Sequence, residues 1–511
     1  AVAARRLGLI PPVADAALPA APPRRAPAWL GAAGLVIAVP LAAVLLPMPA
    51  AVVLLAAAIG SRLVRVPERW LAVFTWGLPF HTLAVMTLFA VVRVPAGPLR
   101  AIAAWKELTV IAVTAGVVGI AATRRGPRSP VAASDLMVGG LIALAMVHVA
   151  VEAAAVGGIT PAVVTFGLRD SILFMLLYFV GRATPAIAAD DRALERIFLV
   201  GVVTAIAGVV ERFFVPPNVL ALAGVAAYYR EFLNVGSFLM EGSDLPINLF
   251  TWMGGRTVRR MGSVYLSGQG FAVPMIIIIP AATALLLETR RRRSAVAWAS
   301  YALLWFGLLA TITRTTIVTC LVQAALLSLL LRRPWLVSAG AVVAAIGAGL
   351  ALVAVPQVAD FVWETLTWQS ASSLTHASDF ERGLSSLLEY PWGRGLGTAD
   401  LTAVRLGRPS ISGDNLFLKY GVELGWPGLL LHAAVLLSIL FAASRVWAAG
   451  ESATVRRFGA VVLAITVGVL VNGGTGVVYN NHVVSFLFFW LAGTTVTLAQ
   501  RRAPAAAPPP A

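Results

Sequence analysis

Arginines at several predicted helix ends of this sequence are placed to bind an anionic group. Arg169 lies in GLRDS, and Arg256 and Arg260 lie together in GGRTVRRMG. Arg314 lies in TITRTT, in a tight turn between two apolar runs. A guanidinium fork binds two oxygens of one phosphate or diphosphate, and helix N-termini add N–H donors. Binding of lipid headgroups is the alternative role, and it is least favoured for Arg314, which is held where unpaired charge is costly.

Two side chains are candidates for accepting a proton. Asp414, in SGDNLFLKYG, either caps the helix that follows or accepts a proton from a sugar hydroxyl, and Asn415 beside it is a candidate substrate ligand. His376 is the second candidate base. We expect it in a loop just before an amphipathic helix, whose capping box would be Ser378 and Glu381.

That helix is predicted from apolar residues that recur on one face, Phe380, Leu384, Leu387 and Leu388, and Pro391 should end it. Arg382 on this helix is a further candidate substrate ligand. Trp392 follows, either to stack on a sugar face or to anchor the chain at the membrane surface. The glycines of PWGRGLGTAD form either an anion-binding nest or a plain tight turn.

The elements that must position these residues are apolar helices. Apolar types make up 59% of the 511 residues and charged types only 12%, whereas soluble domains are about 25% charged. Segments of about 20 apolar residues recur, which is the length that crosses a bilayer as a helix. The candidate spans are 29–46, 49–61, 70–92, 105–123, 135–155, 170–185, 196–215, 270–288, 296–313, 315–331, 335–356, 420–442, 458–476 and 482–499. The predicted fold is therefore an all-α bundle of about fourteen (12–14) transmembrane helices.

The distribution of basic residues predicts how the bundle is oriented. The run Arg290 to Arg293 should be cytoplasmic by the positive-inside rule. With an even number of spans both termini are then cytoplasmic. Residues 1–28 and 501–511 are predicted to be disordered tails, and 29–500 the transmembrane domain.

Two long segments, 216–269 and 357–419, then face outward, and the second should be partly helical. Loops of this length in a compact protein are usually functional.

Other kinds of site are not supported by the sequence. Cys320 is the single cysteine, which excludes a cysteine-based metal site, and no pair of histidines has metal-ligand spacing. Phosphate-binding loops and dinucleotide motifs are also missing. We therefore expect no bound metal, no cofactor and no nucleic-acid partner.

Several motifs, in order, resemble those of the O-antigen ligase and O-antigen polymerase superfamily of bacterial inner membranes. They are GLRDSILFMLLYF, RRMGSVYLSGQGFA, TITRTTIVT, YPWGRGLG and GDNLFLKYGVELGWPGLL, within residues 165–435. The resemblance implies an inverting, metal-independent transfer of a glycan from undecaprenyl diphosphate to a sugar hydroxyl on a glycan or glycolipid acceptor. It implies Arg169, Arg260 and Arg314 as the diphosphate ligands and an active site on the extracytoplasmic face.

One position departs from the family pattern. Ligases of this family carry a histidine directly before the motif asparagine, as the base, where this sequence has Asp414. This favours a polysaccharide polymerase or a less typical ligase, and it leaves Asp414 and His376 as alternative bases. A flippase for lipid-linked oligosaccharides is the rival function, but flippases place charge inside the bundle rather than in long outward loops.

Overall fold

The computed structural model describes residues 66, 68–123, 130–154, 161–253, 256–288, 294–334, 363–364, 367, 369, 371–405, 410–411 and 414–501. The chain divides into the units Ala1–Ser61 and Arg62–Ala511, and every described residue belongs to the second. Three predicted spans, 29–46, 49–61 and 335–356, and nearly all of both predicted tails lie outside the described residues.

The other predicted spans fall on described helices. These are α4 (Glu68–Met86), α6 (Trp105–Thr123), α7 (Ala133–Ala154), α9 (Leu176–Ala183), α10 (Arg192–Phe214), α14 (Met275–Glu288), α15 (Ala295–Ala310), α16 (Arg314–Leu330), α21 (Leu416–Ala449), α22 (Ala453–Gly473) and α23 (His482–Gln500). Among the described residues, eight segments are long and apolar enough to cross a membrane, and three shorter apolar helices accompany them. The helical membrane fold is confirmed, whereas the number fourteen stays a prediction.

The segments predicted to face outward contain short elements of their own. The first holds α11 (Pro217–Leu222), α12 (Val225–Ala227), the antiparallel strands β1 (Phe250–Met253) and β2 (Arg256–Arg259), and α13 (Gly268–Ala272). The second holds α19 (Ala371–Glu389) and α20 (Asp400–Arg405). Two more helices, α5 (Ala96–Ala103) and α8 (Pro161–Ser171), precede α6 and α9.

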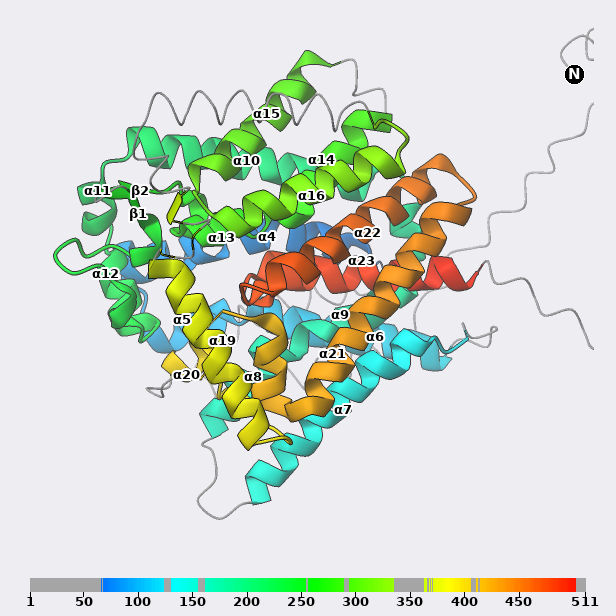
Figure 1. Cartoon of the computed structure of the whole chain (residues 1–511), viewed down its shortest axis with the longest axis horizontal. Coiled ribbons are helices and arrows are strands. Elements are labelled where there is room, and N and C mark those ends of the chain that lie inside the picture. Colours follow the sequence, from blue (N-terminus) through cyan, green and yellow to red (C-terminus); the bar gives the residue numbers. More distant parts are fainter. Residues whose placement is uncertain are drawn as a thin grey trace, which may run out of the picture. The chain divides into compact units, whose positions relative to one another are not determined.

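The core of the bundle lies around α14 and α23. Helix α14 packs against α10, α15, α16 and α22, whereas α23 packs against α4, α9, α21 and α22, as Figure 1 lets the reader follow. The segment MIIIIPAATALLL of α14 is apolar all round and is buried along its whole length, as expected for a central helix. Helices at the periphery instead expose large apolar side chains such as Val147, Leu437 and Phe441, which suits contact with lipid.

Side-chain caps fix where the C-terminal helices begin. Asn415, Ser452 and Asn481 each accept hydrogen bonds from the first backbone N–H groups of α21, α22 and α23. Such caps satisfy donors that the helix itself leaves free. The Asn415 cap of α21 also donates to Gly474, at the end of α22, and α23 begins a few residues further on. These three helix ends therefore lie at one end of the bundle, which we call the loop-rich end.

Candidate functional site

Arg260 and Arg314 lie near each other at the loop-rich end. The Nε of Arg260 donates to the carbonyl oxygen of Thr311 at 2.6 Å, and its guanidinium also donates to Thr313 Oγ1. Burial, together with the neighbouring Arg314 charge, lowers the pKa of Arg260 to about 10. Both acceptors of Arg260 among the described residues are neutral, so a bound anion would offset the cost of holding this partly buried cation beside a second one.

Arg169 belongs to a different cluster of charges. Its Nε contacts Asp170 at 2.8 Å and Glu107 at 3.7 Å. Arg405 Nη1 also lies 3.9 Å from Asp170 Oδ2, so two guanidinium groups neighbour this carboxylate. The fork of Arg169 therefore already binds a carboxylate, and its predicted role as a third diphosphate ligand stays a prediction.

Asp414 and His376 face each other. Asp414 Oδ2 lies 3.4 Å from His376 Nδ1, and both side chains are about one-third exposed. Asp414 is not the cap of α21, because the side chain of Asn415 accepts from the first N–H groups. Burial raises the pKa of Asp414; His376 opposes this shift, whereas the charge of Asp400 adds to it.

The helix that carries His376 differs from its prediction. Helix α19 begins at Ala371, so His376 lies inside it and the capping box at Ser378 and Glu381 is wrong. Alanine and serine at 371–373 are compatible with a helix, so this local signal did not set the boundary. Of the four predicted apolar residues, only Leu387 is buried.

The remaining predicted ligands of the substrate are placed less favourably. Arg382 forms an ion pair with Asp379 on its own helix, and Arg256 stands exposed at the start of β2. Trp392 is 75% exposed. Asn415 is occupied as a cap, and its Nδ2 donates to the carbonyl oxygen of Gly474 at 2.9 Å.

Hydrogen bonds at the end of α22 connect the arginine pair with the carboxylate–imidazole pair. Asn472 Nδ2 donates at 2.9 Å to Thr316, two residues after Arg314. Gly474 accepts from Asn415, which directly follows Asp414. The starts of α16 and α21 are thus held on either side of the same turn, so the two pairs share one end of the bundle.

The glycine-rich segment after α19 forms hydrogen bonds with α21 where that helix is interrupted. We call this segment, residues 391–395, the clasp. Helix α21 is interrupted at Gly425, whose φ of 70° and ψ of −168° are not helical. The carbonyl oxygens of Val422 and Glu423 instead accept from Arg394 N (2.7 Å) and Gly395 N (3.0 Å). These amides are therefore used within the protein, which favours a structural turn over the anion-binding nest.

Replacing Gly425 with alanine should destabilise the protein strongly. A Cβ there would lie 2.2 Å from the carbonyl oxygen of Pro391, and the positive φ disfavours an L-residue. Gly242→Ala is the matched control, because Gly242 also has positive φ (78°) but nothing within 4 Å of its Cβ. Thermal unfolding in detergent should show a much larger loss for Gly425→Ala, and equal losses would contradict the clasp.

Buried charges in the first turns of α21 were not predicted from the sequence. Glu423 is fully buried and accepts from Ser171 Oγ (2.7 Å) and Gly397 N (3.1 Å). Lys419 is 1% exposed, and its Nζ lies 3.6 Å from Asp400. Their partners come from positions far away in the sequence, so no local pattern could have identified them.

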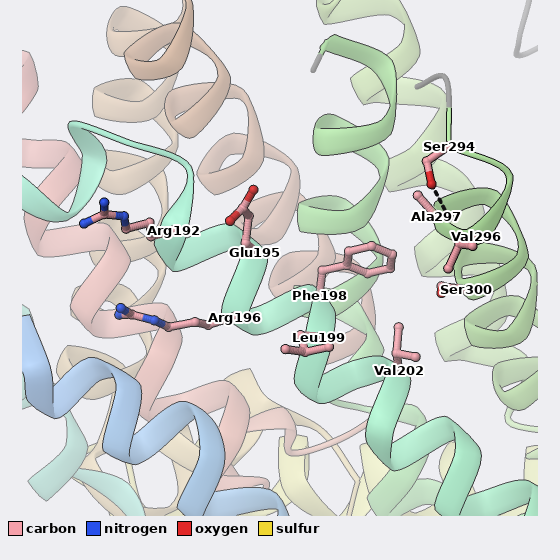
Figure 2. A pocket seen from close by; sticks show the side chains of 10 residues that line it. All are labelled: Arg192, Glu195, Arg196, Phe198, Leu199, Val202, Ser294, Val296, Ala297 and Ser300. Carbon is pink, nitrogen blue, oxygen red and sulfur yellow. Dashed lines mark hydrogen bonds between the residues drawn. The ribbon is translucent and has the colours of Figure 1, made fainter. Parts of the chain in front are cut away.

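A surface hollow of about 370 Å³ lies at the other end of α10, between α10 and α15. Figure 2 shows Phe198 beside it, whereas Arg192 and Arg196 extend away from Ser294 and α15. The hollow is far along α10 from Glu211, which pairs with Arg259 at the loop-rich end. It is therefore separate from the arginine pair.

Together, these observations define a helical membrane protein with charged groups gathered at one end. Residues 299–433 match the family model described as O-Antigen ligase. The matched segment contains Arg314, His376 and Asp414, and the match confirms the resemblance to the O-antigen ligase and polymerase superfamily. It supports a role in glycan transfer or ligation in O-antigen synthesis. Among curated proteins, no match to the chain was found.

Proposed function

We infer that this chain is a membrane glycosyltransferase that moves a glycan from a lipid-linked diphosphate onto a sugar hydroxyl. The observation that carries the proposal is the buried Arg260 with neutral protein partners and a second cation, Arg314, beside it. A diphosphate would place negative charge beside Arg260, whose hydrogen-bond acceptors among the described residues are uncharged. The family match over 299–433 agrees with this chemistry.

In the proposed reaction, the acceptor oxygen attacks the anomeric carbon of the donor with inversion. The bond from that carbon to the phosphate oxygen breaks, and its electron pair leaves with the lipid diphosphate. Arg260 and Arg314 stabilise the charge that develops on this leaving group. No metal or nucleotide is required, because the donor is already activated.

The proposal places the reaction on the extracytoplasmic face of a bacterial inner membrane, with undecaprenyl as the donor lipid. Arg169 and Arg256 are proposed as outer diphosphate contacts. Arg382, Asn415 and Trp392 are proposed as contacts to the sugars. These five remain predictions from the sequence.

A deletion strain tests the function directly. Surface glycan and its lipid-linked precursors are sized by electrophoresis and mass spectrometry. Loss of a polymerase leaves single repeat units on the final acceptor, and loss of a ligase leaves long chains on the carrier lipid. Precursor trapped on the inner leaflet would instead indicate a flippase, and an unchanged glycan profile would reject all three functions.

A further inference from the structure

His376 and Asp414 are distant in the sequence but form a contact at the loop-rich end. His376 comes from the first half of α19, and Asp414 directly precedes the Asn415 cap of α21. Nδ1 of the imidazole is buried and lies 3.4 Å from Asp414 Oδ2, a charge contact without a formed hydrogen bond. About a third of the His376 side chain is exposed.

We propose that His376 is the catalytic base of the proposed transfer and that Asp414 is its positioning residue. Nε2 takes the proton of the acceptor hydroxyl as its oxygen forms the new glycosidic bond. As the ring gains this proton, Asp414 accepts a hydrogen bond from Nδ1–H and stabilises the imidazolium that forms. The proton then passes to water, and the lipid diphosphate leaves with the electron pair of the broken bond. This assignment rests on the proposed function.

The surroundings of Asp414 favour this division of roles. Asp379 of α19 and Asp400 of α20 are the other acids that act on it. Asp379 is paired with Arg382, and Asp400 with Lys419 and the amide of Asn480.

The Asp414 carboxylate lies beside the imidazole, which favours the protonated ring formed during the reaction. Asp414 Oδ2 faces Nδ1 and would hold the ring. Nε2 would then be the nitrogen that contacts the acceptor hydroxyl.

The fixed position of Asp414 supports the same conclusion. The neighbouring Asn415 is tied at both ends, since its oxygen caps α21 and its Nδ2 holds Gly474. Asp414 therefore directly precedes a helix start that is held in place. Two hydrogen bonds, from Asn415 to Gly474 and from Asn472 to Thr316, connect this helix start with the turn that carries Arg314. A base oriented from this point lies at the same end as the arginines that receive the diphosphate.

The test compares His376→Gln, Asp414→Asn and the double variant in purified protein with a labelled lipid-linked donor. His148→Gln and Glu381→Gln are the matched controls: His148 lies in α7, and Glu381 is an exposed carboxylate on α19. We expect His376→Gln to lose roughly a hundredfold or more in rate. Asp414→Asn should lose less, and the double variant should be no slower than His376→Gln, because the two residues act as one unit.

The pH dependence of the rate separates this role from a structural one. The wild-type rate should fall in acid, because a protonated imidazole cannot take the hydroxyl proton, and His376→Gln should lose this dependence. A purely structural role would lower the rate at every pH.

Two different results would overturn the inference. Wild-type rates in His376→Gln, or multiplicative losses in the double variant, would remove the dyad while the transferase function stands. No transfer by the wild-type chain, with lipid-linked donor and acceptor both supplied, would remove the proposed function and the dyad together.

Discussion

Replacing Arg260 with glutamine should lower the rate of glycan transfer by roughly a hundredfold or more, which is typical for loss of one preorganised donor to a developing charge. Arg314→Ala should have an effect of similar size. Both side chains lie at the loop-rich end, and the nearby Arg314 charge helps to lower the pKa of Arg260. As the lipid diphosphate leaves, these two cations would stabilise the negative charge that grows on it.

Arg260→Lys separates charge from geometry. The ammonium keeps the positive charge but cannot donate simultaneously to Thr311, Thr313 and a phosphate as the guanidinium fork does. We therefore expect an intermediate rate. The matched control is Arg230→Gln, which removes an arginine from another segment predicted to face outward, where it pairs with Asp244 and is 57% exposed.

Rates are measured on protein that elutes as a single species and melts like the wild type. A wild-type rate in Arg260→Gln would exclude this residue from the diphosphate site. If that variant is misfolded, Arg260→Lys and Arg314→Ala still decide the matter, since full activity in both contradicts the cationic site.

The apolar helices follow from the sequence, because their causes are local. Long apolar runs predict the helices from α4 to α23, and a tight turn with an arginine predicts where Arg314 lies. Asn415 as a cap could also have been predicted, since Asp and Asn are comparable caps. The backbone direction before α21 decides whether Asp414 or Asn415 faces the first N–H groups of the helix. The sequence pattern does not contain that direction.

The buried polar contacts could not be predicted in this way. Glu423 meets Ser171 and Gly397, and Lys419 meets Asp400, across separations that only the fold closes. The sequence suggested that charge is massed in outward loops, whereas these side chains lie inside the first turns of a helix. In the same way, the glycines of PWGRGLG resembled a ligand loop until the break in α21 accounted for them.

Lys419→Met should be the most destabilising single substitution among the charged residues of α21. Lys419 is 1% exposed, and Asp400, its ion-pair partner, is also buried. Asp170 and Glu423 act on the same ammonium. Removing it leaves these carboxylates without a shared cation, and breaking a buried pair costs about 3–5 kcal/mol.

The measurement is thermal unfolding of purified protein in detergent, with folded yield as a second readout. Lys419→Met combined with Asp400→Asn should recover part of the lost stability, because the uncompensated acid is then neutral. The control Arg230→Met breaks an exposed pair with Asp244 and should change stability little.

A melting temperature of Lys419→Met equal to that of the wild type would mean that this ammonium is not what balances the acids. Failure of Asp400→Asn to restore stability would instead mean that Lys419 acts mainly on Glu423 and Asp170. In that case the Lys419 charge would stabilise the contact between α8 and α21. Ser171 of α8 already donates to Glu423 and accepts from Tyr420 there.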